Sequence, residues 1–189
     1  MQDIKSAILL FIAFTVICGG IYPALVTGVA QALFPQQAGG SFITDASGNR
    51  LGSTLIGQPF SDPKYFWPRP SATSDFGYNP LASGGSNAGP THPAYLQNVA
   101  ERVKALRVSG ITAPLPAEMV QASASGLDPH ISPAAALLQI PRVATARGLA
   151  EATVHQAVTK VSEERQLGIL GAPRVNVLVL NRELDRLSR

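Results

Sequence analysis

AILLFIAFTVICGGIYPALVTGVAQALF, residues 7–34 of this chain, contains no Asp, Glu, Lys or Arg. The hydrocarbon core of a bilayer is about 30 Å thick, and a helix rising about 1.5 Å per residue crosses it in about 20 residues. The stretch exceeds that length, whereas the chain beyond it is polar enough to fold in water. We therefore predict three parts: a short N-terminal segment at 1–6, a transmembrane helix at 7–34, and one soluble domain at 35–189.

A cleaved secretory signal is the alternative to a permanent anchor. Such a signal has a basic start, an apolar core of about 7–15 residues and a small-x-small cleavage site. Ala-Gln-Ala at 30–32 fits that site, but it lies late, and Lys5 is offset by Asp3. The length of the apolar run favours an uncleaved anchor.

Three residues interrupt the apolar run: Gly19, Gly20 and Pro23. Membrane helices tolerate such residues where a neighbouring helix covers the backbone, and small residues permit close helix contact. A partner helix packed against this side is one interpretation. The other is a simple kink at Pro23.

The flanking charges predict the orientation of the helix. Lys5 and the amino terminus precede it, and the first basic residue after it is Arg50. Because cytoplasmic flanks are enriched in Lys and Arg, we expect a cytoplasmic N-terminus. The protein is then single-pass in a bacterial inner membrane, and the domain at 35–189 is periplasmic.

Composition narrows the classes of protein. The net charge is only +3 and no Lys/Arg run is present, so nucleic-acid binding is not supported. The one cysteine, Cys18, lies in the anchor and excludes an intrachain disulfide. About 150 residues beyond the anchor suit a single domain with a sizeable core.

After the anchor we expect a hairpin followed by a long loop. Residues 41–44 and 51–57 flank the turn sequence DASGN at 45–49. Residues 58–93 are rich in Pro and Gly and lack hydrophobic periodicity, yet their aromatic content argues for an ordered loop. Those aromatic residues are Phe60, Tyr65, Phe66, Trp67, Phe76 and Tyr78.

Helical signals dominate the next stretch. Leu96, Val99, Val103 and Leu106 follow helical spacing after Pro93, and Gly110 ends that pattern. Further helices are expected at 116–123, at 133–139 behind a Ser132-Pro133 start, at 141–147 and at 150–164.

The end of the chain predicts a strand. Residues 175–180 alternate within a run rich in β-branched residues, and a short charged helix is expected from Arg182. The predicted fold class is α+β: a single N-terminal transmembrane helix followed by one mixed α/β extracytoplasmic domain.

Catalytic and metal signals are thin. Asp128 and His130 flank a proline, and His155 lies far along the chain. The sequence has no HExxH, no cysteine pair and no Gly-x-Ser-x-Gly. We expect no catalytic residues and no metal site; Asp128 instead orders the turn into the Ser132 helix, with His130 as its hydrogen-bonding partner.

The densest glycine cluster, GGSNAG, lies at 84–89. Successive backbone N–H groups in such a loop can cradle an anion. No Lys-Ser/Thr follows it, and no clear strand precedes it, so glycines that permit tight turns are the favoured interpretation.

Several motifs in order resemble one family closely. They are YFWPRPSA at 65–72, SGGSN at 83–87, SGLDPHISP at 125–133, PRVA at 141–144, GILG at 168–171 and PRVNVL at 173–178. Together with the anchor, they are similar to the C subunit of the Kdp-type potassium-transporting ATPase. The resemblance covers the chain from the anchor to nearly its end.

That resemblance implies an accessory subunit and not a catalyst. In such complexes the A subunit conducts potassium and the B subunit is the P-type ATPase that hydrolyses ATP. The C subunit is an assembly factor and catalytic chaperone that raises the ATP affinity of the B subunit, its soluble domain lying over the periplasmic face of the A subunit. No cofactor of its own is implied, since ATP belongs to the catalytic subunit.

The resemblance also suggests an alternative, a membrane-tethered regulator that binds nucleotide directly through an LSGGQ-like run. The candidates are Ser83, Gly84, Gly85 and Ser86, but an inserted Ala82 and a Ser in place of Gln depart from that pattern. The predicted topology also separates this loop from cytoplasmic ATP. An effect transmitted through a conformational equilibrium is the simpler expectation.

For the partner interface we single out Tyr65, Phe66, Trp67 and Arg69, beside the helix residues Gly19, Gly20 and Pro23. Aromatic and Arg side chains often dominate binding energy. The alternative for the aromatic residues is that they anchor an irregular loop to the core, and the sequence does not separate the two.

Overall fold

The computed structural model describes residues 2–45 and 47–187. The chain divides into two compact units, residues 1–51 and 52–189, which are described separately. The first unit carries the long apolar helix. The second carries a mixed helix and strand domain, so the predicted fold class is confirmed.

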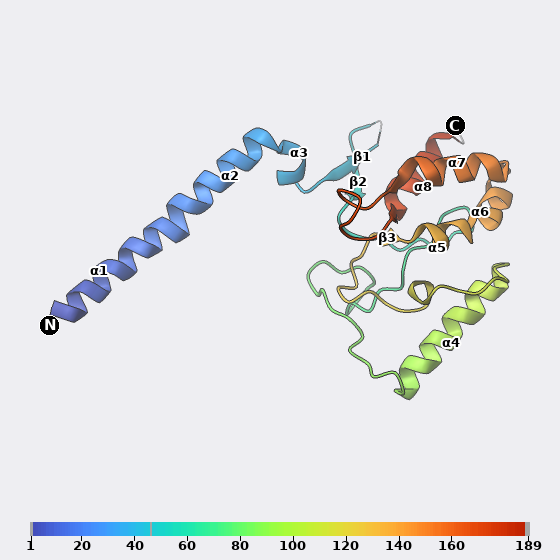
Figure 1. Cartoon of the computed structure of the whole chain (residues 1–189), viewed down its shortest axis with the longest axis horizontal. Helices are drawn as coiled ribbons and strands as arrows, with labels where there is room; N and C mark the ends of the chain where they lie inside the picture. The colour runs from blue at the N-terminus through green and yellow to red at the C-terminus, as the bar shows by residue number, and fades with distance from the viewer. Residues whose placement is uncertain (1, 46, 188–189) are drawn as a thin grey trace. The chain divides into compact units, whose positions relative to one another are not determined.

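The long helix is continuous but not uniform (Figure 1). It comprises α1 (Gln2–Val16), a π-helical turn (Ile17–Ile21) and α2 (Tyr22–Leu33). In the π turn the Tyr22 N–H donates to the carbonyl of Ile17, five residues earlier. Pro23 has no N–H for the carbonyl four residues earlier and its ring crowds that group, so a widened turn just before it relieves the conflict.

The length and composition of this helix suffice to cross a membrane. It spans Gln2–Leu33, 32 residues with a mean hydropathy of 2.3. None of the described side chains of α1, the π turn and α2 is buried within the chain. An apolar helix with no protein cover needs lipid or a partner around it.

A short helix, α3 (Pro35–Ala38), and a hairpin of β1 (Phe42–Thr44) and β2 (Arg50–Ser53) follow. The expected turn is built by Asp45, whose Oδ1 accepts the N–H groups of Ser47 and Asn49 at 2.8 and 2.9 Å. The turn's Ala46 lies outside the described residues. The second strand ends at Ser53, four residues earlier than the expected 57.

In the second unit, α5, α7 and α8 contact the central strand of a small antiparallel sheet of order β3-β5-β4. Ile131 of β3 and Ser162 of β4 both pair with Val175 of β5. α7 packs against α6 and α8, and α5 packs on α7 and β5. The elements are α4 (Pro93–Val108), a 3-10 turn (Ala117–Met119), β3 (His130–Ile131), α5 (Pro133–Leu137), α6 (Ile140–Arg147), α7 (Glu151–Val161), β4 (Ser162–Glu163), β5 (Arg174–Asn176) and α8 (Val177–Leu187).

Several predicted helix boundaries are confirmed. α4 starts at Pro93 and ends before Gly110. Ser132 caps α5, its Oγ accepting the Ala135 N–H at 3.1 Å, and Pro133 occupies the first turn. α6 begins at Ile140, one residue before the predicted start, with Pro141 in its first turn, and Gly148 ends it in the left-handed conformation.

The strand predicted at 175–180 is wrong beyond Asn176, because α8 begins at Val177. The Asn176 Oδ1 accepts the N–H of Val179 at 3.2 Å, which is the geometry of a helix cap. Over six residues, alternation and helical spacing overlap, and the buried side chains of α8 follow the helical period. Those buried residues are Val177, Leu178, Leu180, Asn181 and Leu184.

The helix predicted at 116–123 is also wrong in extent, since only the 3-10 turn Ala117–Met119 forms. Its side chains are bound by tertiary contacts: Met119 is buried, and the Glu118 carboxylate accepts the Ser132 N–H at 3.1 Å. A 3-10 turn of this length is a common connector between longer elements.

Within the described residues, 54–92 forms no helix and no strand, yet the chain there is packed. Phe66 is fully buried in the core, and Tyr78 and Asn79 are also buried. Side-chain hydrogen bonds from Asn181 and Gln139 take the place of a ladder of backbone bonds at Phe66 and Trp67.

Candidate functional site

Two buried side-chain amides hold the YFWPRPSA motif in place. Phe66 donates its N–H to Asn181 Oδ1 at 2.8 Å, and the Asn181 Nδ2 donates back to the Phe66 carbonyl at 3.0 Å. Trp67 is held in the same way by Gln139, with distances of 2.8 and 3.1 Å. Each amide thus satisfies both backbone groups of one loop residue, as a neighbouring strand would.

Two arginines, Arg142 and Arg147, bind the backbone carbonyls of loop residues 63–65. Arg142 donates to the carbonyls of Pro63 and Tyr65 at 2.6 and 3.0 Å, and its guanidinium lies 3.9 Å from the centre of the Trp67 ring. Burial lowers the pKa of Arg142 to about 10, although the charge of Asp62 opposes the shift. Stacking and paired hydrogen bonds together fix the loop on α6.

Arg147 is the second of these arginines. It donates to the Lys64 carbonyl at 2.6 Å and to Asp185 Oδ1 at 2.9 Å. Its guanidinium carbon lies 5.1 Å from the centre of the Tyr65 ring. The Tyr65 hydroxyl donates to the other oxygen of Asp185 at 3.4 Å. Arg142 and Arg147 therefore bridge segments within the domain.

The four loop residues singled out for a partner differ in access. Phe66 lies in the core, where a partner cannot reach its side chain without unfolding the loop. Tyr65, Trp67 and Arg69 are half-buried. Those three remain predicted contacts, whereas Phe66 anchors the loop.

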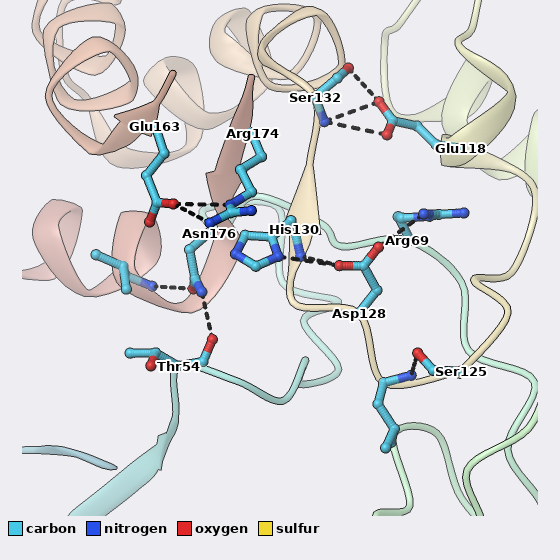
Figure 2. Close-up of polar contacts among 12 residues, drawn as sticks. Thr54, Arg69, Glu118, Ser125, Asp128, His130, Ser132, Glu163, Arg174 and Asn176 are labelled. Atoms are coloured by element: carbon cyan, nitrogen blue, oxygen red, sulfur yellow. Dashed lines mark hydrogen bonds and ion pairs between the residues drawn. The ribbon is translucent and has the colours of Figure 1, made fainter. Parts of the chain in front are cut away.

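Asp128 lies between a guanidinium and an imidazole (Figure 2). Its Oδ2 accepts from Arg69 Nη1 at 2.9 Å, and its Oδ1 accepts the His130 N–H at 3.0 Å. The His130 Nδ1 lies 3.3 Å from that same Oδ1. Asp128 orders the turn into the Ser132 helix with His130 as its partner, as predicted.

The surroundings of Asp128 favour its charged form. Burial raises the pKa of its carboxyl, but the hydrogen bonds from His130 and the charge of Arg69 lower it by more, so the pKa lies below the usual 3.8. Burial also raises the pKa of the Tyr78 phenol, whose hydroxyl donates to the Arg69 carbonyl.

No three His, Cys, Asp or Glu side chains within residues 2–45 and 47–187 gather in a metal-binding group. His155 lies on the exposed face of α7, where its Nδ1 contacts Thr159 at 3.5 Å. The structure thus brings Asp128 and His130 together in a structural contact and leaves His155 in a separate helix.

The glycine loop packs on the segment before Asp128. Gly84 donates its N–H to the Ser125 carbonyl at 2.9 Å, and the Ser83 Oγ donates to the same carbonyl at 3.1 Å. A Cβ on Gly85 would lie 3.0 Å from the Ala124 carbonyl. The Gly84 N–H, the group that would cradle a phosphate, is already bonded within the protein.

Three motifs meet at Gly126, which has φ +68°. A Cβ there would lie 2.6 Å from Thr73 Cγ2 and 2.8 Å from the Gly84 carbonyl. The Ser71 Oγ donates to the Gly126 carbonyl at 2.8 Å and accepts the Tyr78 N–H at 2.9 Å. RPSA, SGGSN and SGLDPH are therefore one packed unit.

A groove of about 470 Å³ opens beside this unit. Phe60, Trp67 and Tyr78 line it with aromatic surface, and Arg69 and Arg102 line it with positive charge. This groove is the place where two of the predicted contact residues, Trp67 and Arg69, are accessible together.

Sequence reasoning missed Gln139 and Asn181, which position the loop. Each is a polar residue in a run otherwise apolar at helical spacing, and both are almost wholly buried. A buried amide must find partners, so that break in the pattern was the available signal.

In the anchor, Gly19 and Gly20 form part of the π turn, and Pro23 follows it. A Cβ added at either glycine would meet nothing within 4 Å in this chain. The side of the helix that carries Gly19 and Gly20 is therefore uncovered in this chain, and its contact with a partner helix stays a prediction.

Fold and site together define a class of protein: a mixed α+β domain carried behind one apolar helix of membrane-spanning length, with its motif residues bonded to one another. The family model described as "KdpC: K+-transporting ATPase, c chain" matches residues 4–186. The chain belongs to this family.

Similar proteins named "Potassium-transporting ATPase KdpC subunit" match over the whole chain. The one from Geobacter metallireducens is 67% identical over 188 residues, which is 100% of both chains. That from Geobacter sulfurreducens is 66% identical over 187 residues, 99% of each, and that from Methylococcus capsulatus is 56% identical over 189 residues, 99% of each.

Proposed function

We propose that this chain is a non-catalytic accessory subunit of a high-affinity, ATP-driven potassium uptake complex. It assists assembly and acts as a catalytic chaperone that raises the ATP affinity of the P-type ATPase subunit. The observation that carries the proposal is the family match over 4–186, which takes in the anchor and the domain together. Partners are the potassium-conducting A subunit, the ATP-hydrolysing B subunit and the lipid bilayer.

The proposed placement follows from charge and length. Segment 1–6 is cytoplasmic, the helix crosses a bacterial inner membrane, and the domain at 35–189 is periplasmic, over the A subunit. Lys5 before the helix and the lack of a basic residue before Arg50 support this orientation. Protease added to intact spheroplasts should digest the domain; protection until lysis contradicts the placement.

The proposed effect on ATP affinity runs through the membrane. The packed glycine loop supports this route over direct contact, because the Gly84 N–H and the Ser83 hydroxyl are already bonded to Ser125. A subunit that binds one conformation of the pump better shifts the pump toward it, and a shifted equilibrium changes ligand affinity elsewhere.

The anchor supplies the sharpest test of the proposal. Deleting residues 1–34 should abolish co-purification with the complex and lower potassium-stimulated ATP hydrolysis. A second variant, in which Gly19 and Gly20 are both replaced by Leu, keeps the span. Because an added Cβ at either position meets nothing within 4 Å in this chain, a loss of assembly relative to the control below indicates contact with a partner.

The matched control is Ala7→Leu, which adds the same side chain elsewhere on an exposed part of the helix. It should assemble normally, whereas the Gly19/Gly20 variant should lose the A subunit and raise the KM for ATP. A complex that assembles and turns over normally without residues 1–34 would refute the proposed function.

A further inference from the structure

The groove beside the YFWPRPSA motif combines apolar walls with charge of one sign. Phe60, Trp67, Pro68 and Tyr78 supply apolar walls, and its volume is about 470 Å³. Among the described residues that line it, Arg69 and Arg102 carry positive charge and none carries a carboxylate. An occupant therefore needs an apolar part and a negative part.

Both guanidinium groups are fixed by one contact while other N–H donors remain. Arg69 Nη1 bonds Asp128 at 2.9 Å. Arg102 Nη1 donates to the Val120 carbonyl at 2.9 Å. An Arg has five N–H donors, so each retains capacity for an incoming carboxylate.

The groove is also held in shape before any partner arrives. Gln139 fixes the Trp67 backbone and Arg142 stacks on its ring. The Tyr78 hydroxyl donates to the Arg69 carbonyl, joining two walls. Groups that are already ordered lose little entropy on binding.

We propose that this groove binds an extended segment of the potassium-conducting subunit, with a carboxylate placed between Arg69 and Arg102 and a neighbouring apolar side chain against Trp67. The charge of the lining argues for the carboxylate, and the proline and aromatic walls suit an extended chain. The inference rests on the proposed function, and it names the part of the partner that this site takes.

Arg102 and Arg107 provide a matched pair for the test. Both lie on α4 and both donate from Nη1 to loop carbonyls, Arg107 to those of Ile111 and Ala113. Arg102 lines the groove and Arg107 does not. The complex is purified in detergent through a tag on this chain, and the A subunit retained is measured at rising NaCl concentrations.

Arg102→Glu should weaken retention of the A subunit by at least about tenfold, since it places like charge against the partner. Arg102→Gln, which removes the positive charge without reversing it, should weaken it less and flatten its salt dependence. Arg107→Glu should behave as the parent protein. Melting temperatures of all three variants show whether the domain is intact.

A photocrosslinking residue, p-benzoylphenylalanine, at Ser61 in the groove identifies the occupant, and one at exposed Gln156 on α7 is the control. The adduct expected from Ser61 is an extracytoplasmic A-subunit peptide with Asp or Glu. Two results would refute binding of the A subunit in the groove while leaving the proposed function standing. One is that Arg102→Glu retains the A subunit as the parent does, and the other is an adduct only with a second copy of this chain. Failure of the parent chain to retain the A subunit overturns both.

Discussion

Asn181 holds the backbone of Phe66 from 115 residues further along the chain, accepting its N–H at 2.8 Å and donating to its carbonyl at 3.0 Å. Both residues are buried. Gln139 does the same for Trp67. An irregular, proline-rich loop thus enters the core without leaving its backbone groups unpaired.

Replacing Asn181 with Leu should destabilise the domain by about 2–5 kcal/mol, because two buried backbone groups lose their partners. Trp67 is the only tryptophan, so its fluorescence reports this loop directly. Urea unfolding of the full chain in detergent measures the effect. Gln156→Leu, on an exposed position of α7, should stay within about 0.5 kcal/mol; a neutral Asn181→Leu would contradict the role given to the amide.

Asp128 makes the domain acid-sensitive. Its pKa is lower in the folded protein than the usual 3.8, so its contribution is present above pH 3.8 and is lost as pH falls below that value. Asp128→Asn should lower the free energy of unfolding at pH 7 by about 1 kcal/mol, a figure reduced for partial exposure. Between pH 4 and pH 2 the variant should lose less stability than the parent protein, because it lacks the titrating carboxyl. Parallel stability curves for the two proteins over that range would argue against the linkage.

Gly126→Ala should destabilise the domain by about 2 kcal/mol or more, since φ is +68° and the added Cβ meets Thr73 and the Gly84 carbonyl under 3 Å. Gly89→Ala is the control, because a Cβ there meets nothing within 4 Å. Thermal unfolding of both variants measures the difference. Equal melting temperatures would mean that the three motifs do not pack as one unit.

Asn176→Ala should cost about 1–2 kcal/mol, because the Val179 N–H loses its cap and the Thr54 carbonyl loses a donor at 2.8 Å (Figure 2). Far-ultraviolet circular dichroism during urea unfolding checks this. Asn176→Ser separates the two contacts: its hydroxyl can still cap the helix but is too short to donate to Thr54, so it should fall between the parent and the alanine variant.

The sequence predicted well where the signal was local. The apolar run gave the long helix, and Pro93, Ser132 and Pro141 marked helix starts, because capping and the fixed φ of proline act within one turn. It predicted poorly at 175–180, where alternation suits a strand or one face of a helix. There the Asn176 cap decided the outcome.

The candidate site divides in the same way. Asp128 and His130, two residues apart, were predicted as partners and are. Gln139, Arg142 and Asn181 were not linked to the aromatic loop, because the spacing of residues carries no information about which distant backbone an amide will meet.

By itself, the sequence determined an uncharged stretch long enough to cross a bilayer, one mixed domain after it, and the family to which the chain belongs. It could do so because hydrophobic length and helix starts depend only on neighbouring residues. Only the tertiary structure decided that Phe66 belongs to the core while Trp67 and Arg69 line an open groove. The physical reason is that every buried N–H and C=O needs a partner, and in a loop without helix or strand that partner came from residues 72 and 115 positions away.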